Sequence, residues 1–148
     1  MHKEVELLGK CEPHPNLLPL VAYSLDSGCP PCLCYPLCVG GTLEDRLMPK
    51  ADAAKQRLRA LGWAETPHSL QWRSRLAILR DAARALTHLH GQGMLHGDVK
   101  PSNILLTHSG AARLADFGLA RMAKRHAPDA TVASVSAVKG TAAFLDPI

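Results

Sequence analysis

His96-Gly97-Asp98-Val99-Lys100-Pro101-Ser102-Asn103 is the most specific stretch of this 148-residue chain. It is interpreted together with a second run, Asp116-Phe117-Gly118. The two runs place a carboxamide, on Asn103, and a carboxylate, on Asp116, within a short part of the sequence. Carboxamide and carboxylate oxygens are the hard ligands that Mg²⁺ prefers. The pattern therefore predicts that Asn103 and Asp116 bind magnesium.

Asp98 and Lys100, in the first run, add the groups that act on a substrate. Asp98 can accept a hydrogen bond from an attacking hydroxyl and orient it. Lys100, two residues later, is expected on the same side of an extended loop, where its ammonium can stabilise charge on a moving phosphoryl group. Each run alone is compatible with an ordinary turn or strand exit. Their joint order and spacing favour phosphoryl transfer, with Asp98 and Lys100 as catalytic residues.

A β-hairpin is predicted between the two runs. Residues 104–106 are apolar, residues 107–110 have the composition of a turn, and residues 113–115 lead into Asp116. The hairpin holds Asn103 on one strand and Asp116 just past the other, so both magnesium ligands are expected at the same end of it.

These motifs resemble the catalytic loop and the magnesium motif of eukaryotic protein kinases, and a lysine two residues after Asp98 looks like the serine/threonine class. Two further runs, residues 41–47 and 140–147, resemble the interleukin-1-receptor-associated (Pelle-like) kinases and the plant receptor-like kinases. The resemblance covers nearly the whole chain except about residues 48–68. It implies an ATP-dependent protein serine/threonine kinase with ATP and Mg²⁺ as cofactors, protein substrates, and receptor or adaptor proteins as further partners.

The resemblance implies an α+β, protein-kinase-like fold that is present in part. Residues 1–38 correspond to the end of the N-lobe and the hinge, with short antiparallel strands at 17–24 and 32–37. Residues 39–148 correspond to the mainly helical first half of the C-lobe, up to the activation segment. Neither a glycine-rich loop nor a Val-Ala-Ile-Lys strand precedes Glu4, so we expect little turnover from these residues alone.

Three helices are predicted from apolar spacing and capping residues, at 4–11, at 42–47 with Thr42 as the cap, and at 69–90. The last helix is indicated by residues that recur at helical spacing: Leu76, Leu79, Ala83, Leu86 and His90. Residues 48–68 are expected to form a partly helical surface insert.

Further nucleotide-site residues follow from the resemblance. Glu4 corresponds to the helix glutamate that pairs with a strand lysine, and Glu6 is kept as an alternative. Tyr35 corresponds to the gatekeeper, Cys38 to a hinge residue whose backbone groups bond adenine, and Leu105 to a residue that packs under the adenine ring.

The resemblance also assigns structural roles near the catalytic loop. Four residues match the hydrophobic spine that links the two lobes: Leu8, Leu20, His96 and Phe117. His96 is further interpreted as a core histidine bonded to the backbone near Asp116, and Thr141 resembles the threonine that bonds the catalytic aspartate and lysine. Gly97 stands where many kinases have an arginine that pairs with an activation-loop phosphate, which weakens the case for that switch. Three hydroxyls of the following segment are interpreted as ordinary loop polarity: Thr131, Ser134 and Ser136.

Composition and charge argue against other classes of function. The net charge is only +4, and the few aromatic residues (two Trp, two Tyr and two Phe) are dispersed, so nucleic-acid binding is not indicated. No apolar run reaches membrane-spanning length, and no secretory signal pattern is visible. We therefore expect a cytoplasmic protein with no membrane segment in this chain.

Five cysteines lie at positions 11, 29, 32, 34 and 38. Cys29-Pro30-Pro31-Cys32 has the spacing of a redox or zinc half-site, and Cys34 and Cys38 complete a four-ligand set on paper. A strand followed by a hinge points those two side chains to different faces, so reduced, partly buried thiols are favoured over a metal site.

Two other functions stay open. A truncated or degenerate kinase domain would act as a non-catalytic module that binds partners. A small-molecule phosphotransferase of the aminoglycoside or choline kinase type shares the His-Gly-Asp run with an asparagine five residues after the aspartate, although Lys100 and the run Asp116-Phe117-Gly118 argue against it.

Overall fold

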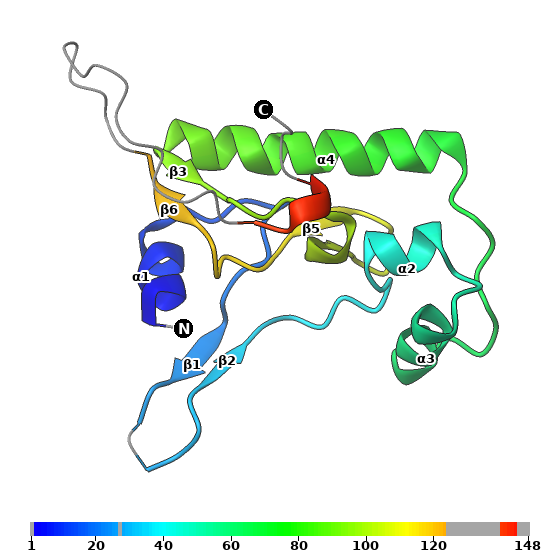
Figure 1. Cartoon of the computed structure of the whole chain (residues 1–148), viewed down its shortest axis with the longest axis horizontal. Coiled ribbons are helices and arrows are strands. Elements are labelled where there is room, and N and C mark those ends of the chain that lie inside the picture. Colours follow the sequence, from blue (N-terminus) through cyan, green and yellow to red (C-terminus); the bar gives the residue numbers. More distant parts are fainter. Residues whose placement is uncertain (1, 27, 124–139, 145–148) are drawn as a thin grey trace.

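The computed structural model describes residues 2–26, 28–123 and 140–144 and has an α+β architecture (Figure 1). The helices are α1 (His2–Lys10), α2 (Leu43–Leu47), α3 (Asp52–Ala60) and α4 (Trp72–Gly91), with 3-10 turns η1 (Pro101–Asn103) and η2 (Ala142–Phe144). The strands are β1 (Ala22–Ser24), β2 (Cys32–Cys34), β3 (Met94–Leu95), β4 (Ile104–Leu106), β5 (Ala112–Leu114) and β6 (Arg121–Met122). The predicted fold class is confirmed. Thr131, Ser134, Ser136 and the last residues of the 140–147 run lie outside the described residues.

The strands of the described residues form two-stranded antiparallel pairs, β1–β2, β3–β6 and β4–β5. Tyr23 lies opposite Leu33 in the first pair, which confirms the predicted antiparallel arrangement, although both strands are shorter than predicted. Leu17, at the start of the predicted strand, instead forms a parallel bridge to Leu114 of β5. Pro19 separates the two parts because it has no N–H to donate to a ladder.

Helix α4 buries a face other than the apolar stripe that indicated the helix in the sequence. Its buried positions are Ile78, Asp81, Ala82, Ala85 and Leu89, whereas Leu76 and Leu79 are 50% and 57% exposed. Both stripes have helical spacing, so periodicity alone does not choose between them. On the observed face, Asp81 Oδ2 accepts a hydrogen bond from the Ala112 N–H of β5 at 3.2 Å. The predicted helix is confirmed, and part of its apolar stripe is exposed. Within the described residues, none of the helices combines the length and the apolar character needed to cross a bilayer.

The β4–β5 hairpin lies between two loops that satisfy its outer edges. On the β4 edge, the Gly40 N–H donates to Leu106 O at 2.9 Å and the Leu106 N–H donates to Gly41 O at 2.8 Å. A Cβ at Gly40 would lie 2.6 Å from Leu106 O, so the close approach of these two backbones requires glycine there. The hinge is thereby attached to β4.

The β5 edge is held by residues that come much earlier in the chain. The Leu18 N–H donates to Leu114 O at 2.9 Å, and the Leu114 N–H donates to Asn16 O at 2.8 Å. The buried Asn16 side chain adds a bond from Nδ2 to Ala112 O at 3.0 Å. Together with Asp81 of α4, these contacts pair the backbone groups of β5 on both sides.

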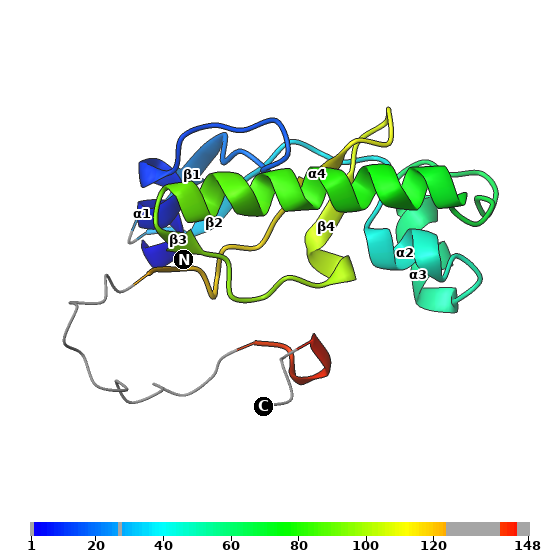
Figure 2. The same cartoon turned by 90° about the horizontal axis from the view of Figure 1, so that it is seen from above.

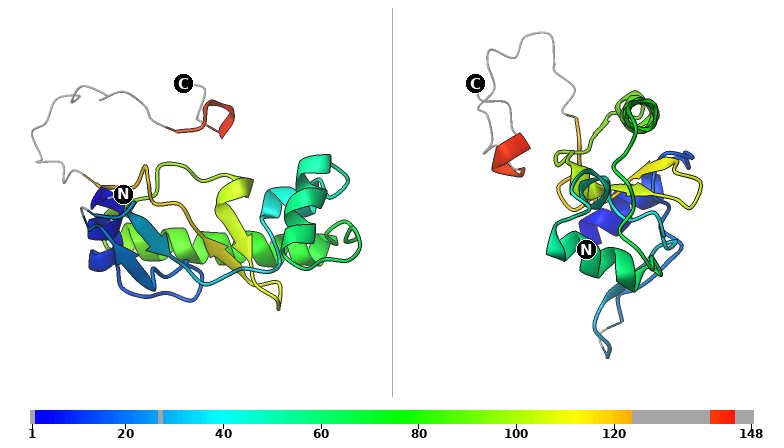
Figure 3. Two further views of the ribbon diagram at one scale, coloured as in Figure 1. Left: turned by 90° about the horizontal axis from the view of Figure 1, so that it is seen from below. Right: turned by 90° about the vertical axis from the view of Figure 1, so that its right-hand side faces the viewer.

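The predicted insert packs against α2 through α3 and against the predicted hinge through Trp63. Thr42 caps α2 as predicted, and it forms a capping box in which Thr42 Oγ1 accepts from the Asp45 N–H at 3.0 Å and the Thr42 N–H donates to Asp45 Oδ2 at 3.1 Å. Arg57 of α3 donates to Asp45 Oδ1 at 2.8 Å. Trp63 then donates its indole N–H to Val39 O at 2.8 Å. Figure 3 shows α2 and α3, in cyan and teal, together at the end of the molecule opposite α1.

Candidate active site

The loop between β3 and η1 is anchored by His96, which is almost completely buried at 2% exposure. Its Nδ1 accepts from the Asp98 N–H at 3.3 Å, so the ring proton lies on Nε2, which donates to Ala115 O at 3.0 Å. The ring meets Phe117 edge-on at 5.2 Å. Burial lowers the pKa of His96. The predicted core histidine bonded to the backbone next to Asp116 is confirmed.

Gly97 adopts a conformation that other residues rarely take. Its φ is +82°, and a Cβ at this position would lie 2.8 Å from Leu119 O. Glycine allows the backbone of the loop to pass close to the residues that follow Phe117.

Asp98 lies at the centre of a hydrogen-bonded network. Lys100 Nζ lies 2.6 Å from Asp98 Oδ2. Thr141 donates to Asp98 Oδ1 through both its hydroxyl, at 2.7 Å, and its backbone N–H, at 3.0 Å, and its hydroxyl accepts from Lys100 Nζ at 2.8 Å. The contacts predicted for Thr141 are confirmed. Figure 2 shows the segment from β3 to η1 along the edge of the molecule that faces residues 140–144.

This network keeps Asp98 ionised. The hydrogen bond from the Lys100 ammonium, helped by those from Thr141, lowers the pKa of Asp98 to about 2 against the opposing effect of burial. At neutral pH Asp98 is therefore a hydrogen-bond acceptor of fixed orientation rather than a strong base.

Asn103 joins the catalytic loop to the strand that carries Asp116. Asn103 Nδ2 donates to Asp98 O at 2.8 Å and to Asp98 Oδ2 at 3.1 Å. Asn103 O accepts from the Ala115 N–H at 2.8 Å, so the backbone next to Asp116 runs beside Asn103. Among the described residues, no donor is bonded to Asn103 Oδ1, and this carboxamide oxygen is available as a ligand.

Asp116 is exposed and has φ +66°, the only positive φ among the described non-glycine residues. Its Oδ1 accepts from the Gly118 N–H at 3.2 Å, which fixes the carboxylate at the turn after β5. A carboxylate and a carboxamide oxygen at one end of the β4–β5 hairpin fit Mg²⁺, which takes one or two protein oxygens together with phosphate and water.

A small apolar cluster lies next to this end of the hairpin. Its buried members are Leu18, Cys38 and Ala115, and Tyr35 and Leu105 pack against them. Cys38, the predicted hinge residue, and Leu105, the predicted adenine-contact residue, thus lie in one cluster with Ala115, which directly precedes Asp116. The cluster is a small part of the hydrophobic core, separate from the main one.

Glu4 of α1 faces this cluster and Glu6 does not. The Tyr35 hydroxyl donates to Glu4 Oε1 at 2.9 Å, whereas Glu6 is exposed and pairs with Lys10 at 2.6 Å. Burial and the neighbouring Glu4 carboxylate raise the pKa of Tyr35. The geometry therefore favours Glu4 over Glu6 as the glutamate that points toward the site.

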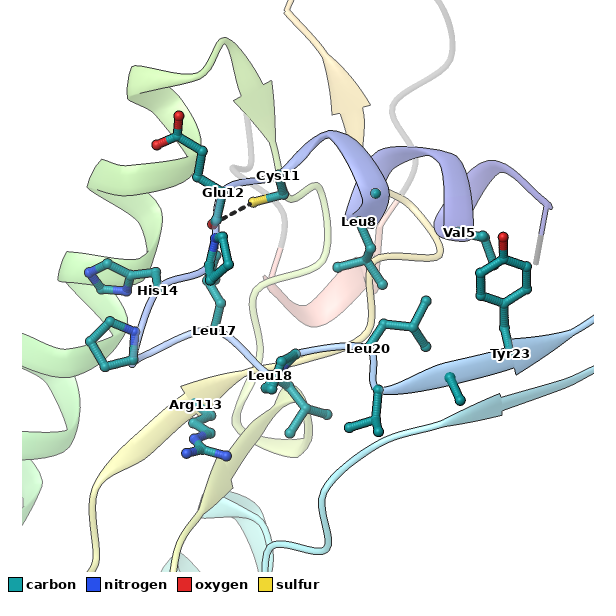
Figure 4. A pocket seen from close by; sticks show the side chains of 16 residues that line it. Val5, Leu8, Cys11, Glu12, His14, Leu17, Leu18, Leu20, Tyr23 and Arg113 are labelled. Carbon is teal, nitrogen blue, oxygen red and sulfur yellow. Dashed lines mark hydrogen bonds between the residues drawn. The ribbon is translucent and has the colours of Figure 1, made fainter.

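A large cavity of the described residues lies away from the loop between β3 and η1. It has a volume of about 810 Å³ and is bounded by α1, by the segment from Glu12 to Tyr23 and by Arg113 (Figure 4). Leu8 and Leu20, two predicted spine residues, both line it, and Leu8 also packs against the main core that contains Phe117. None of the residues that surround Asp98 lines this cavity, so cavity size alone does not locate the candidate site.

The cysteines do not gather into a cluster. Cys29, Cys32 and Cys34 are exposed, Cys11 is half-buried and Cys38 is buried, all as free thiols. Among the described residues, no group of three His, Cys, Asp or Glu side chains is arranged to hold a metal ion.

Two residues that support the site escaped the sequence analysis, Asn16 and Asp81. Both are buried and polar and bind the backbone of β5, which leads to Asp116. Asp81 carried a usable signal, because a charged residue between apolar positions of a helix is often paired when buried. Asn16 follows a turn and had no comparable signal.

The fold and this site define a protein-kinase-like catalytic region, in which a hinge, a catalytic loop and an Asp-Phe-Gly turn meet at the end of one hairpin. A sequence model of the family described as protein tyrosine and serine/threonine kinase matches residues 1–140. The chain belongs to this family.

Relatives of the chain come from the groups suggested by its motifs. It is similar to the nodulation receptor kinase of Pisum sativum (39% identity, 97% of this chain and 14% of the relative) and to interleukin-1 receptor-associated kinase 1 of Mus musculus (36%, 96% and 19%). It is also similar to the serine/threonine-protein kinase pelle of Drosophila melanogaster (39%, 90% and 25%). The chain thus spans a quarter or less of the length of these relatives.

Proposed function

We propose that the chain is part of an ATP-dependent protein serine/threonine kinase that transfers the γ-phosphoryl group of Mg-ATP to protein hydroxyls. The observation that carries this proposal is the network in which Lys100, Thr141 and Asn103 all bond Asp98. The name of the pelle relative supports the serine/threonine class. The names of the nodulation receptor kinase and of the interleukin-1 receptor-associated kinase support a role in signalling close to receptors.

Asp98 and Lys100 are proposed as the catalytic residues. Asp98 accepts the hydrogen bond of a substrate hydroxyl and aligns it for in-line attack. Because its pKa is about 2, Asp98 takes the proton only after charge has developed on the attacking oxygen. Lys100 lies 2.6 Å from Asp98, so its ammonium can stabilise charge on the transferred group in the transition state.

Asn103 and Asp116 are proposed to hold Mg²⁺, through Asn103 Oδ1 and the Asp116 carboxylate. When bound, Mg²⁺ neutralises the charge of the β- and γ-phosphates. The hydrogen bonds from Asn103 Nδ2 to Asp98 orient the carboxamide, so that its oxygen points away from the catalytic carboxylate.

Cys38, Leu105 and Glu4 are proposed as nucleotide-site residues. Backbone groups of Cys38 would bond the edge of the adenine, and Leu105 would pack against its face. Glu4 would hold the lysine that contacts the phosphates in kinases of this type, after exchange of its present hydrogen bond with Tyr35.

Phosphate transfer tests the catalytic assignment. Residues 1–148 replace the matching segment of the pelle kinase, and kcat is measured for the chimera and for its Asp98→Asn variant. We expect kcat to fall about 10²- to 10⁴-fold, the usual contribution of a positioned acid or base. Asp52→Asn on α3, a carboxylate that is fully exposed, is the matched control and should leave kcat unchanged. Equal kcat in the chimera and its Asp98→Asn variant would refute the assignment.

A non-catalytic binding module is a second candidate, favoured by the engagement of Glu4 by the Tyr35 hydroxyl. A module would give the same binding to a partner protein in the wild-type and Asp98→Asn chimeras, with no transfer in either. The serine/threonine kinase proposal requires transfer in the first.

A further inference from the structure

Arg46 of α2 has no ion-pair partner among the described residues, unlike the two acidic residues of the same helix. Arg57 of α3 pairs with both acidic neighbours, with Asp45 Oδ1 at 2.6 Å and with Glu44 Oε2 at 3.7 Å. Arg46 pairs with neither of them, and among the described residues no carboxylate lies within ion-pair distance of it. Its positive charge is therefore not neutralised by the α2–α3 unit.

The guanidinium of Arg46 is nevertheless half-buried. Its Cζ lies 4.8 Å from the centre of the Trp63 ring, and its Nη1 reaches Gly40 O at 3.5 Å, the outer limit of a hydrogen bond. Arg46 Nε is buried and has no hydrogen-bond partner among the described residues, and burial lowers the pKa of the side chain. A buried charge is normally paired with an opposite charge. Among the described residues, no anionic group takes this place beside Arg46.

A cavity of about 680 Å³ lies beside Arg46. Apolar side chains from three separate parts of the chain form most of its wall, among them Leu61, Leu70, Ile78 and Leu106. Arg46 is the only arginine or lysine that lines it among the described residues. The other polar side chains of the wall are three hydroxyls and one imidazole: Ser74, Thr107, Ser109 and His108. The cavity lies behind the hinge and shares no residue with the network around Asp98.

We propose that this cavity binds a carboxylate attached to an apolar body, with the carboxylate paired to Arg46 and the body packed on Trp63 and the leucines. Guanidinium and carboxylate match in charge and in planar geometry. A phosphate dianion would need a second permanent cation, and besides Arg46 the wall offers only the His108 imidazole. The site is independent of the proposed kinase activity, so either proposal can fail without the other.

Benzoate is the probe that tests the site, because it combines one carboxylate with an aromatic body. In ¹H–¹⁵N spectra of the labelled 148-residue chain, benzoate should shift the Arg46 Nε–H and Trp63 indole signals in a saturable way. Benzamide, its neutral analogue, should not shift them, and Arg46→Gln should abolish the Trp63 response to benzoate. Equal shifts with benzamide, or no shift with benzoate, would overturn the proposal. Tighter binding of phenyl phosphate than of benzoate would overturn the ligand class.

Thermal unfolding separates a ligand site from a structural arginine. Arg46→Met keeps the apolar stem and removes the charge, so its Tm without ligand should be equal to or above that of the wild type. Saturating benzoate should raise the Tm of the wild type and leave that of Arg46→Met unchanged. Arg57→Met is the matched control, because it removes a partner of buried Asp45 and should lower the Tm. An equal loss of Tm in both variants would assign Arg46 a structural role and refute the site.

Discussion

Lys100→Met removes the ammonium that lies 2.6 Å from Asp98 Oδ2 and keeps most of the side-chain volume. Lys100 is the largest cause of the low pKa of Asp98, and the two hydrogen bonds from Thr141 come after it. The variant therefore measures how much of the lowering of the Asp98 pKa depends on the contact with Lys100.

The magnitude follows from the pKa. A pKa lowered from the ordinary 3.8 to about 2 corresponds to roughly 2 kcal/mol, at about 1.4 kcal/mol per pKa unit. With the Thr141 bonds retained, we expect the pKa of Asp98 in Lys100→Met to rise by about one unit and the free energy of unfolding at pH 7 to fall by about 1 kcal/mol. Because the folded-state pKa is the lower one, this stabilisation is present above about pH 4 and is lost as the pH falls through about 2.

The pKa is measured by following the ¹³C signal of the Asp98 carboxyl during a pH titration, and the free energy of unfolding by urea denaturation at pH 7. Lys55→Met is the control, since its partner Asp52 is fully exposed and such a pair contributes little. An Asp98 pKa that stays near 2 in Lys100→Met would refute the assignment of the low pKa to Lys100.

Three further substitutions test the packing around the site. Gly97→Ala should lower the free energy of unfolding by about 1–2 kcal/mol, because its φ is +82° and the new Cβ meets a carbonyl; Gly91→Ala, in open space at the end of α4, should be neutral or stabilising in the same urea assay. Arg57→Met should cost about 2–3 kcal/mol by leaving a buried carboxylate without its cation, and a cost no larger than that of Lys55→Met would contradict the pairing. The ultraviolet pH titration of the wild type should contain a phenol that ionises above the ordinary tyrosine pKa, and Tyr35→Phe should remove that part of the curve. If the high-pH part of the curve is the same in both proteins, the tyrosine is not held against the helix glutamate Glu4.

The parts of the fold that the sequence predicts are those set by neighbours in the chain. Thr42 precedes the first turn of α2 and caps it as predicted, and the turn at 107–110 closes the expected hairpin between β4 and β5. The spacing of Asp98, Lys100 and Asn103 likewise fixes which polar groups share one loop. In each case the relevant contact spans only a few residues, so a local pattern carries enough information.

The errors concern contacts between distant segments. Helix α4 has two apolar stripes, and only its packing against β5 decides that Ile78 is buried and Leu79 exposed. Similarly, Pro19 indicates an irregular start of the first strand, but nothing in the local sequence indicates that Leu17 bridges Leu114. Periodicity indicates that one face of a helix or strand is apolar, but it does not indicate which other element packs against that face.

The same distinction applies to the chemistry. Asn103 and Asp116 are recognisable from their own motifs. The backbone next to Asp116 runs beside Asn103, and the hairpin between them is fixed at β5 by Asn16 and Asp81, which are 96 and 31 residues from Ala112 in the sequence. Neither of these supporting residues contacts the proposed magnesium ligands. The proposed site residues can thus be recognised from the local sequence. The position of the hairpin between them depends on buried hydrogen bonds from distant segments to the backbone of β5.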